Sequence, residues 1–219
     1  MSRVSRAVLG LYTGRSVATR AHVRIRWVTC PFPAVAAVVP PVGRVLEVGC
    51  GHGLFSCYLA VASSGRQVHG VDLDPDKIDD AGAAAGRARG LGASVEFAAA
   101  PSGAVPAGPW DAVVIVDVLY LLDAAGQRDL IAQCAARLAP GGVLVVKEMG
   151  TRPRWKFRWN TVQETLSVRV LRITVGRDLT FLPPNELAGA MREAGLQVTV
   201  DLAVDRGRPH PHHLLVGRA

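Results

Sequence analysis

Hydrophobic residues between positions 44 and 149 form short continuous runs that alternate with stripes of helical spacing. Continuous runs are typical of strands buried on both faces, whereas a strand with one wet face alternates apolar and polar residues. Strands that alternate with helices predict a parallel sheet with helices on both sides. The runs are Val45–Val48, Gln67–Leu73, Ser94–Ala98, Asp111–Val116 and Val143–Lys147.

The helical stripes carry start and stop signals. Asp74 precedes Pro75, and an acidic cap before a proline in the first turn predicts a helix that runs to about Gly90. A further helix is predicted from about Pro184 to Gly195, followed by two final strands, Gln197–Ala203 and His213–Gly217. Pro140-Gly141-Gly142 is expected to end another helix, whose stripe is Leu130, Ile131, Cys134 and Leu138.

The composition supports one globular unit. The chain has 219 residues, of which 49% are hydrophobic, so it can bury a core and global disorder is excluded. No apolar run approaches the roughly 20 residues of a membrane-spanning helix, and the N-terminus lacks the apolar core of a secretory signal. The four cysteines form no CxxC pair, which suits a reducing cytosol, and we expect a cytoplasmic protein.

The net charge of +7 is unevenly distributed. Arginines dominate before the first acid, Glu47, and again between Arg152 and Arg177. Such clusters favour an anionic partner, whether nucleic acid, a phospholipid surface or an acidic substrate. A general abundance of Arg, Ala and Gly would produce the same pattern, so the charge alone does not choose a partner.

A glycine-rich loop follows the first predicted strand. It reads Glu47-Val-Gly-Cys-Gly-His-Gly53, and glycines there allow a sharp turn and close approach of the backbone to a ligand. The dinucleotide pattern GxGxxG fails, because its third glycine would fall at Leu54. Asp72 ends the next strand, where a carboxylate can bind ribose hydroxyls.

Four segments in order resemble the class I S-adenosylmethionine-dependent methyltransferases, in their small-molecule branch. They are VLEVGCGHG, VHGVDLDP, PWDAVVIVDVLYLLD and LAPGGVLVVKE. The resemblance implies a Rossmann-like, doubly wound α/β sheet of seven strands whose last strand is antiparallel, with N-terminal helices and a helical insertion after strand five. It implies S-adenosylmethionine as the cofactor and S-adenosylhomocysteine as the product.

The resemblance also implies a division of the chain and a set of site residues. One methyltransferase domain would span 1–219, comprising an N-terminal helical cap (1–43), the cofactor-binding core (44–149), a substrate or lid insertion (150–182) and a C-terminal helix with two strands (183–219). The methionine part of the cofactor would lie against Glu47, Gly49, Cys50, Gly51 and Gly53. Asp72 would bind the ribose and Leu73 the adenine, with Asp117 and Val118 near the amino-acid end or the substrate.

The chain departs from many relatives at two positions. No acid follows the third strand, so contact with the adenine amine falls to Ser102 or the backbone. No histidine follows the fourth strand, so the usual general base is missing. The candidates for a base are Glu148, which we prefer, and then Tyr120, His22 and Glu164. Alternatively, Lys147 and Glu148 only pair with each other at a strand end, and His22 is structural.

The segment 152–173 lies where the family inserts substrate-selecting structure. It is basic and aromatic, so Trp155, Trp159 and the nearby Lys147 are expected to contact the acceptor. The same pattern suits a membrane interface, a phosphate-bearing or acidic lipid, an aromatic acceptor, or a helix that merely packs on the core. No metal site is predicted, because His210, His212 and His213 share one loop without a nearby carboxylate.

The sequence thus predicts methyl transfer to a small or amphipathic acceptor, lipid-like or acidic, by in-line displacement with catalysis mainly by positioning. A nucleic-acid methyltransferase is a second hypothesis, disfavoured because strand four ends in Asp-Val-Leu-Tyr and no RNA-binding module is evident. A non-catalytic cofactor-binding protein is a third. We expect a monomer or homodimer with peripheral membrane contact.

Overall fold

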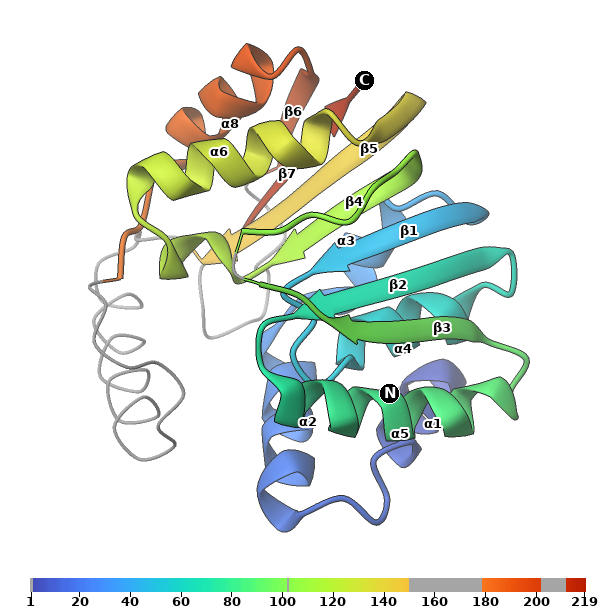
Figure 1. Cartoon of the computed structure of the whole chain (residues 1–219). Coiled ribbons are helices and arrows are strands. Elements are labelled where there is room, and N and C mark those ends of the chain that lie inside the picture. Colours follow the sequence, from blue (N-terminus) through green and yellow to red (C-terminus); the bar gives the residue numbers. More distant parts are fainter. Residues whose placement is uncertain (1, 102, 150–178, 202–211) are drawn as a thin grey trace.

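The computed structural model describes residues 2–101, 103–149, 179–201 and 212–219. Within these residues seven strands form one sheet of the order β3-β2-β1-β4-β5-β7-β6, and Figure 1 shows its strands side by side. Strands β1 to β5 pair in parallel, and β7 is antiparallel to both β5 and β6. The predicted doubly wound sheet with an antiparallel last strand is confirmed. The strands are β1 (Gly43–Val48), β2 (Arg66–Asp72), β3 (Ser94–Ala99), β4 (Trp110–Val116), β5 (Leu138–Met149), β6 (Gln197–Asp201) and β7 (His212–Arg218).

Helices precede and connect these strands, and the caps read from the sequence are in place. The Asp74 side chain accepts the backbone N–H groups of Asp76 and Lys77 at the start of α5, as predicted. The helices are α1 (Arg3–Gly10), α2 (Val17–Thr29), α3 (Phe32–Ala37), α4 (Leu54–Ala62), α5 (Pro75–Arg89), α6 (Ala124–Ala135) and α8 (Pro184–Glu193), with a 3-10 turn η1 (Leu119–Leu121) after β4. None of the helices in the described ranges is long and apolar enough to cross a membrane.

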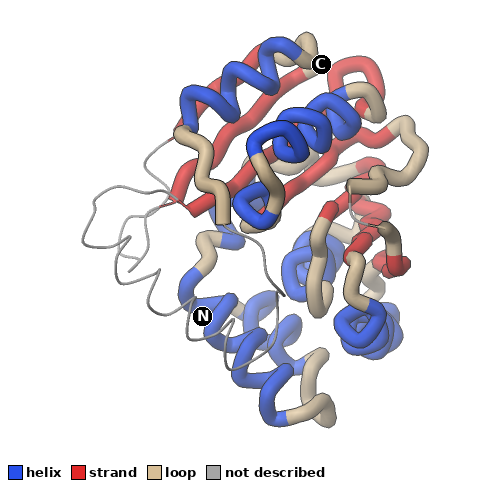
Figure 2. The backbone as a smooth tube through the Cα atoms, turned by 60° about the vertical axis from the view of Figure 1, so that its left-hand side comes forward, coloured by secondary structure: helices blue, strands red, loops and turns tan. Residues whose placement is uncertain are grey.

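The sheet separates two hydrophobic cores, because neighbouring residues of each strand point to opposite faces. Val45, Val68 and Val114 pack with α1 to α5. Leu46, Ile115 and Leu144 pack with α6 and α8 on the other face. Figure 2 shows one group of helices on each side of the strands. Burial on both faces explains why the strands read as continuous apolar runs.

One predicted boundary is wrong. The helix expected to include Leu138 ends at Ala135, and β5 begins at Leu138 instead of Val143. Pro140 disfavours helical backbone only at Ala139, and the helix ends earlier, with Ala136 as its C-cap, because Leu138 already belongs to the sheet. Leu138 instead pairs with Trp110, whose N–H donates to the Arg137 carbonyl at 2.9 Å.

Candidate active site

The glycine loop lies between the carboxyl ends of β1 and β2. The N–H groups of Gly49 and Cys50 both donate to the Val71 carbonyl, at 2.8 and 3.0 Å. Gly49 has a φ of +75°, and a Cβ there would lie 2.3 Å from Cγ2 of Val118. Any side chain at this position would therefore displace Val118, so glycine is required where the loop approaches the end of β4.

At Gly51 the backbone conformation, and not steric crowding, favours glycine. Its φ is +53°, yet a Cβ there would meet no atom within 4 Å, so the loop faces open space. Its N–H donates to Oδ2 of Asp72 at 2.7 Å, and the Asp74 N–H donates to Oδ1 at 3.0 Å. A carboxylate accepts about four hydrogen bonds, so Asp72 keeps capacity for a ligand beside this opening.

An apolar cavity lies next to Asp72. Leu73 is 66% exposed, which is unusual for a large apolar side chain at the end of a buried strand. The cavity has a volume of about 460 Å³, and its walls are Leu73, Pro75, Ala99, Ala100 and Pro101. An apolar cavity beside a fixed carboxylate fits a ligand with a flat hydrophobic ring and a hydroxylated sugar.

A cluster of three charges lies at the carboxyl ends of β4 and β5, with Asp117 and Lys147 buried and Arg26 partly exposed. Asp117 accepts from Nζ of Lys147 at 2.6 Å and from Nη1 of Arg26, on α2, at 2.8 Å. Burial alone would raise the pKa of Asp117, but the two cations hold that pKa well below its usual range. The cluster therefore carries one surplus positive charge, and the Lys147 side chain is fully buried within it.

The backbone of Asp117 is also unusual. Its φ is +57°, the left-handed region that non-glycine residues rarely adopt. Such a conformation costs on the order of 1–3 kcal/mol and is concentrated at functional sites. The sequence indicated Asp117 but missed Arg26. The available signal was the spacing of Thr19, His22 and Arg26, which share one face of α2.

Glu148 follows Lys147 in β5 and makes hydrogen bonds to other groups than Lys147 does. Its Oε1 accepts the N–H groups of Val118 and Leu119 at 3.0 and 2.9 Å. Burial, together with the negative charge of Asp117, raises the pKa of Glu148 to about 8. The two side chains do not pair with each other, so that alternative is wrong. A catalytic role for Glu148 stays a prediction.

Tyr120 lies in η1, at the same edge of the sheet. Its ring stacks on Phe181 with centroids 5.2 Å apart and an interplanar angle of 9°. The Thr180 N–H donates to the Tyr120 carbonyl at 2.9 Å, which joins this turn to the segment before α8. An aromatic pair therefore borders the site, and Tyr120 is close enough to Arg26 to influence its pKa.

His22 and Glu47 both lie at the glycine loop. The ring of His22 lies 5.1 Å from that of His52. Burial lowers the pKa of His22 to about 4, so its imidazole is neutral and weakly basic at neutral pH. Glu47 is buried beneath the loop, accepts from the Ser56 hydroxyl, and has its pKa raised to about 8 by burial.

Of the remaining residues singled out in the sequence, His212 lies at this same edge, where it pairs with Met149, and others fall outside the described residues. Ser102, Trp155, Trp159, Glu164 and His210 fall outside the described residues. His212, at the start of β7, is buried, and its Nε2 lies 2.9 Å from the Thr29 carbonyl.

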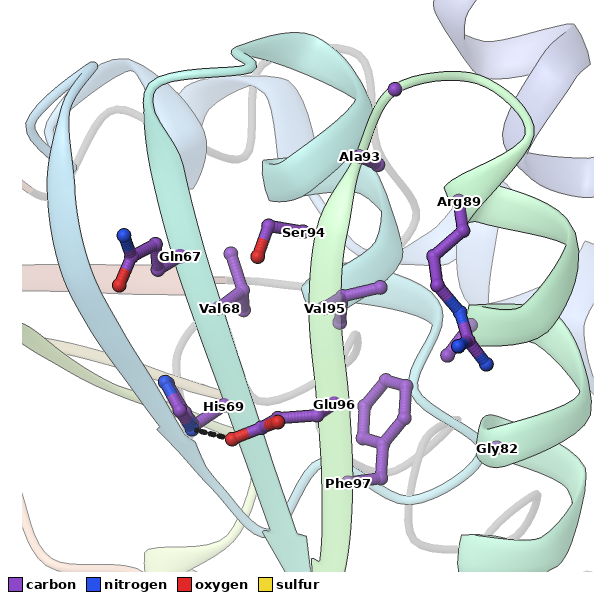
Figure 3. Close-up of a pocket in the computed structure, with 12 residues that line it drawn as sticks. Gln67, Val68, His69, Gly82, Arg89, Ala93, Ser94, Val95, Glu96 and Phe97 are labelled. Carbon is purple, nitrogen blue, oxygen red and sulfur yellow. Dashed lines mark ion pairs between the residues drawn. The ribbon is translucent and has the colours of Figure 1, made fainter.

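A larger cavity, of about 550 Å³, follows the open edge of β3 (Figure 3). His69 and Glu96 form an ion pair of 2.6 Å on one side of it, and Phe97 lies beside Gly82 of α5 on the other. Ligands of open α/β sheets bind at the carboxyl ends of the strands. We therefore place the candidate site at the glycine loop and not in this cavity.

The comparison with known proteins agrees with this geometry. A family model described as a methyltransferase domain matches residues 30–200. This chain belongs to the S-adenosylmethionine-dependent methyltransferases. The resemblance predicted from four motifs, the enzyme class and the cofactor are confirmed.

Curated relatives of this methyltransferase include O-methyltransferases. The ubiquinone biosynthesis O-methyltransferase of Bordetella bronchiseptica is 34% identical over 163 residues, which are 71% of this chain and 63% of that protein. The protein of the same name from Xanthomonas axonopodis pv. citri is 33% identical over 170 residues, covering 75% of this chain and 67% of that protein. The matched stretch thus spans less than two thirds of the Bordetella relative's length.

Solved structures share the fold of the methyltransferase. An O-methyltransferase family protein from Burkholderia thailandensis has a TM-score of 0.69 and 24% identity, with 94% of this chain and 61% of that chain covered. Magnesium protoporphyrin IX methyltransferase from Synechocystis was solved with bound S-adenosylhomocysteine. It has a TM-score of 0.65 and 17% identity, with 94% of this chain and 89% of that chain covered.

Proposed function

We propose that this methyltransferase methylates a hydroxyl group on a small, lipid-like aromatic acceptor. The observation that carries the proposal is the similarity, over 71% of the chain, to an enzyme named for O-methylation in ubiquinone biosynthesis. The stacked pair Tyr120 and Phe181 supports it, because aromatic side chains at the sheet edge suit an aromatic acceptor. Methylation of a small molecule also agrees with the family, whereas neither observation favours a nucleic acid.

The residues of the site fit S-adenosylmethionine. We assign the adenine to the apolar cavity at Leu73, because an exposed leucine beside small apolar residues offers a flat surface. We assign the ribose to Asp72, which keeps acceptor capacity at the open side of the loop. The amino-acid end would lie over Gly49–Gly53 near Asp117, where the surplus charge of Arg26 attracts a carboxylate.

S-adenosylmethionine supplies an already activated methyl group, so the protein contributes mainly position and a dry environment. Glu47 keeps its place beneath the loop through Ser56, and its raised pKa leaves it uncharged near neutral pH. Glu148 fits a positioning role, since its carboxyl group holds the η1 turn with Val118 and Tyr120. We therefore propose Tyr120, the second candidate from the sequence, as the general base in place of Glu148, because its aromatic ring lies at the acceptor side.

Transfer of a radiolabelled methyl group tests the acceptor. Catechols with and without a prenyl or long alkyl tail are incubated with the enzyme and labelled cofactor, alone and with anionic phospholipid vesicles. We expect methoxy product from the tailed catechols, and much less of it with an Asp72→Ala variant when the labelled cofactor is below its wild-type KM. Labelling of transfer RNA in a salt-sensitive manner, without labelling of any catechol, would instead support the nucleic-acid alternative.

Four further expectations belong to this proposal. The division into cap, core, insertion and C-terminal part stays a prediction, as do a cytoplasmic location and a monomeric or homodimeric state. Stimulation by vesicles in the same assay would support peripheral membrane contact. Size-exclusion chromatography with light scattering would decide the oligomeric state.

A further inference from the structure

His52, in the glycine loop, is held by the N-terminal part of the chain. The Tyr12 hydroxyl donates to the His52 carbonyl at 2.8 Å. The Nδ1 atom of His52 lies 3.1 Å from Oδ2 of Asp80, and its ring makes an edge contact with His22. His52 is thus held through its backbone carbonyl, its ring nitrogen and a ring contact with His22.

Asp80, on α5, is the point at which these contacts meet. Its carboxylate is buried and accepts from Nε of Arg15 at 2.5 Å and from the Thr19 hydroxyl at 2.8 Å, besides His52. The three partners come from the α1–α2 connection, from α2 and from the glycine loop. A neutral imidazole can donate here through Nδ1, so the arrangement does not require a charged histidine.

Helix α2 therefore bridges the two sides of the cofactor site. Thr19, His22 and Arg26 lie on one face of α2 and reach Asp80, His52 and Asp117 in turn. Asp80 lies on the helix after the strand that ends in Asp72, and Asp117 lies at the end of β4. Figure 1 shows α2 at the arrowhead end of the sheet.

We propose that Asp80 is a positioning residue, which docks α2 onto the glycine loop so that docking of α2 and binding of S-adenosylmethionine stabilise each other. The inference rests on the cofactor site proposed above. Two events that share one set of contacts are thermodynamically coupled, and the coupling is reciprocal. Cofactor binding should order α2, and loss of the Asp80 contacts should weaken cofactor binding without touching the cofactor.

The test compares the wild type with Asp80→Asn, which removes the charge and keeps the shape. Calorimetric titration should show S-adenosylhomocysteine binding about tenfold more weakly, the effect of losing a charge-assisted hydrogen bond. Hydrogen exchange of residues 17–29 should be slowed by S-adenosylhomocysteine in the wild type and little in the variant. In turnover, KM for S-adenosylmethionine should rise while kcat at saturation is largely kept.

Asp129→Asn is the matched control, because that carboxylate lies on α6 and accepts only a side-chain bond from Gln133, at 2.7 Å, among the contacts described. Thr19→Val, which removes one bond to Asp80, replaces Asp80→Asn if the latter does not fold. If Asp80→Asn binds S-adenosylhomocysteine as tightly as the wild type and the exchange of residues 17–29 responds to the ligand in the same way, the proposal is wrong. It is also wrong if hydrogen exchange in Asp80→Asn becomes faster throughout the sheet, because Asp80 would then stabilise the whole fold. Failure of the cofactor site would appear separately, as unchanged affinity in Asp72→Ala.

Discussion

The guanidinium of Arg26 lies 2.8 Å from the carboxylate of Asp117, although 91 residues separate them in the sequence. The contact joins α2 to the strained residue at the end of β4, and Lys147 contacts the same carboxylate at 2.6 Å. Because two cations surround one anion, a positive charge remains at the edge where the cofactor is proposed to bind.

Arg26→Gln should weaken S-adenosylhomocysteine binding by roughly tenfold or more, because a charged donor beside the ligand's carboxylate is lost. Asp117 keeps Lys147 as a partner, so the fold should survive. Calorimetric titration measures the change. Arg24→Gln, on the exposed side of the same helix, is the control, and equal affinities for the two variants would contradict the assignment.

Asp72→Ala should also weaken cofactor binding by at least about tenfold, since hydrogen bonds from the ribose to a charged acceptor disappear. The variant also loses the bonds from Gly51 and Asp74, so its melting temperature is recorded in parallel. Calorimetric titration of the wild type and of Asp72→Ala with S-adenosylhomocysteine measures the change in affinity. If Asp72→Ala binds S-adenosylhomocysteine as tightly as the wild type, the assignment of the ribose to Asp72 is wrong.

Glu47 should make stability depend on pH. Burial raises its pKa from 4.5 to about 8, so the folded state holds its proton more tightly than the unfolded state. Its stabilising contribution is therefore complete below about pH 4.5 and is lost as the pH rises toward 8. Relative to Glu47→Gln, whose side chain stays neutral, the wild type should lose on the order of 2–4 kcal/mol across this range.

Urea unfolding at pH 5, 6, 7 and 8 measures the effect as a difference between the two proteins. Glu193→Gln, at an exposed position of α8, should differ from the wild type by a constant amount. A constant difference for Glu47→Gln as well would show that the Glu47 carboxyl titrates alike in both states.

Glu148→Ala should destabilise the protein by roughly 2–4 kcal/mol, because the Val118 and Leu119 N–H groups lose their buried acceptor. Glu148→Gln keeps an acceptor oxygen, so it should be milder and retain most of the turnover. Urea unfolding and steady-state kinetics separate the two effects. A general base contributes about 100-fold or more, and a loss of that size in Glu148→Gln would identify Glu148 as the base.

Arg66→Met should destabilise the fold without altering cofactor affinity per folded molecule. The guanidinium is buried and donates to four backbone carbonyls, at distances of 2.8 to 3.2 Å, those of Ala36, Val39, Pro40 and Leu59. Their loss should cost about 3 kcal/mol in urea unfolding. Arg128→Met is the control, because that side chain is exposed, and a similar cost there would contradict the explanation.

The loop geometry of the proposed cofactor half could be predicted because it is encoded locally. Gly49 and Gly51 adopt their turn within one strand-to-helix connection, and Asp72 ends the adjacent strand, so register alone brings them together. The proposed acceptor half could not be predicted, because its contacts join distant segments of the chain. Tyr120 stacks on Phe181, and Glu148 accepts hydrogen bonds from the η1 turn. Lys147, a predicted acceptor contact, is instead enclosed with Asp117.

The sequence by itself determined the order of strands and helices, the glycine loop and the enzyme class, because these follow from short-range periodicity and from neighbouring residues. Only the tertiary structure decided which charges meet. Arg26 was one arginine among many and Asp80 one acid on a helix, until folding brought each beside a buried partner far along the chain. Burial makes an unpaired charge costly, so the fold selects partners that spacing alone does not specify.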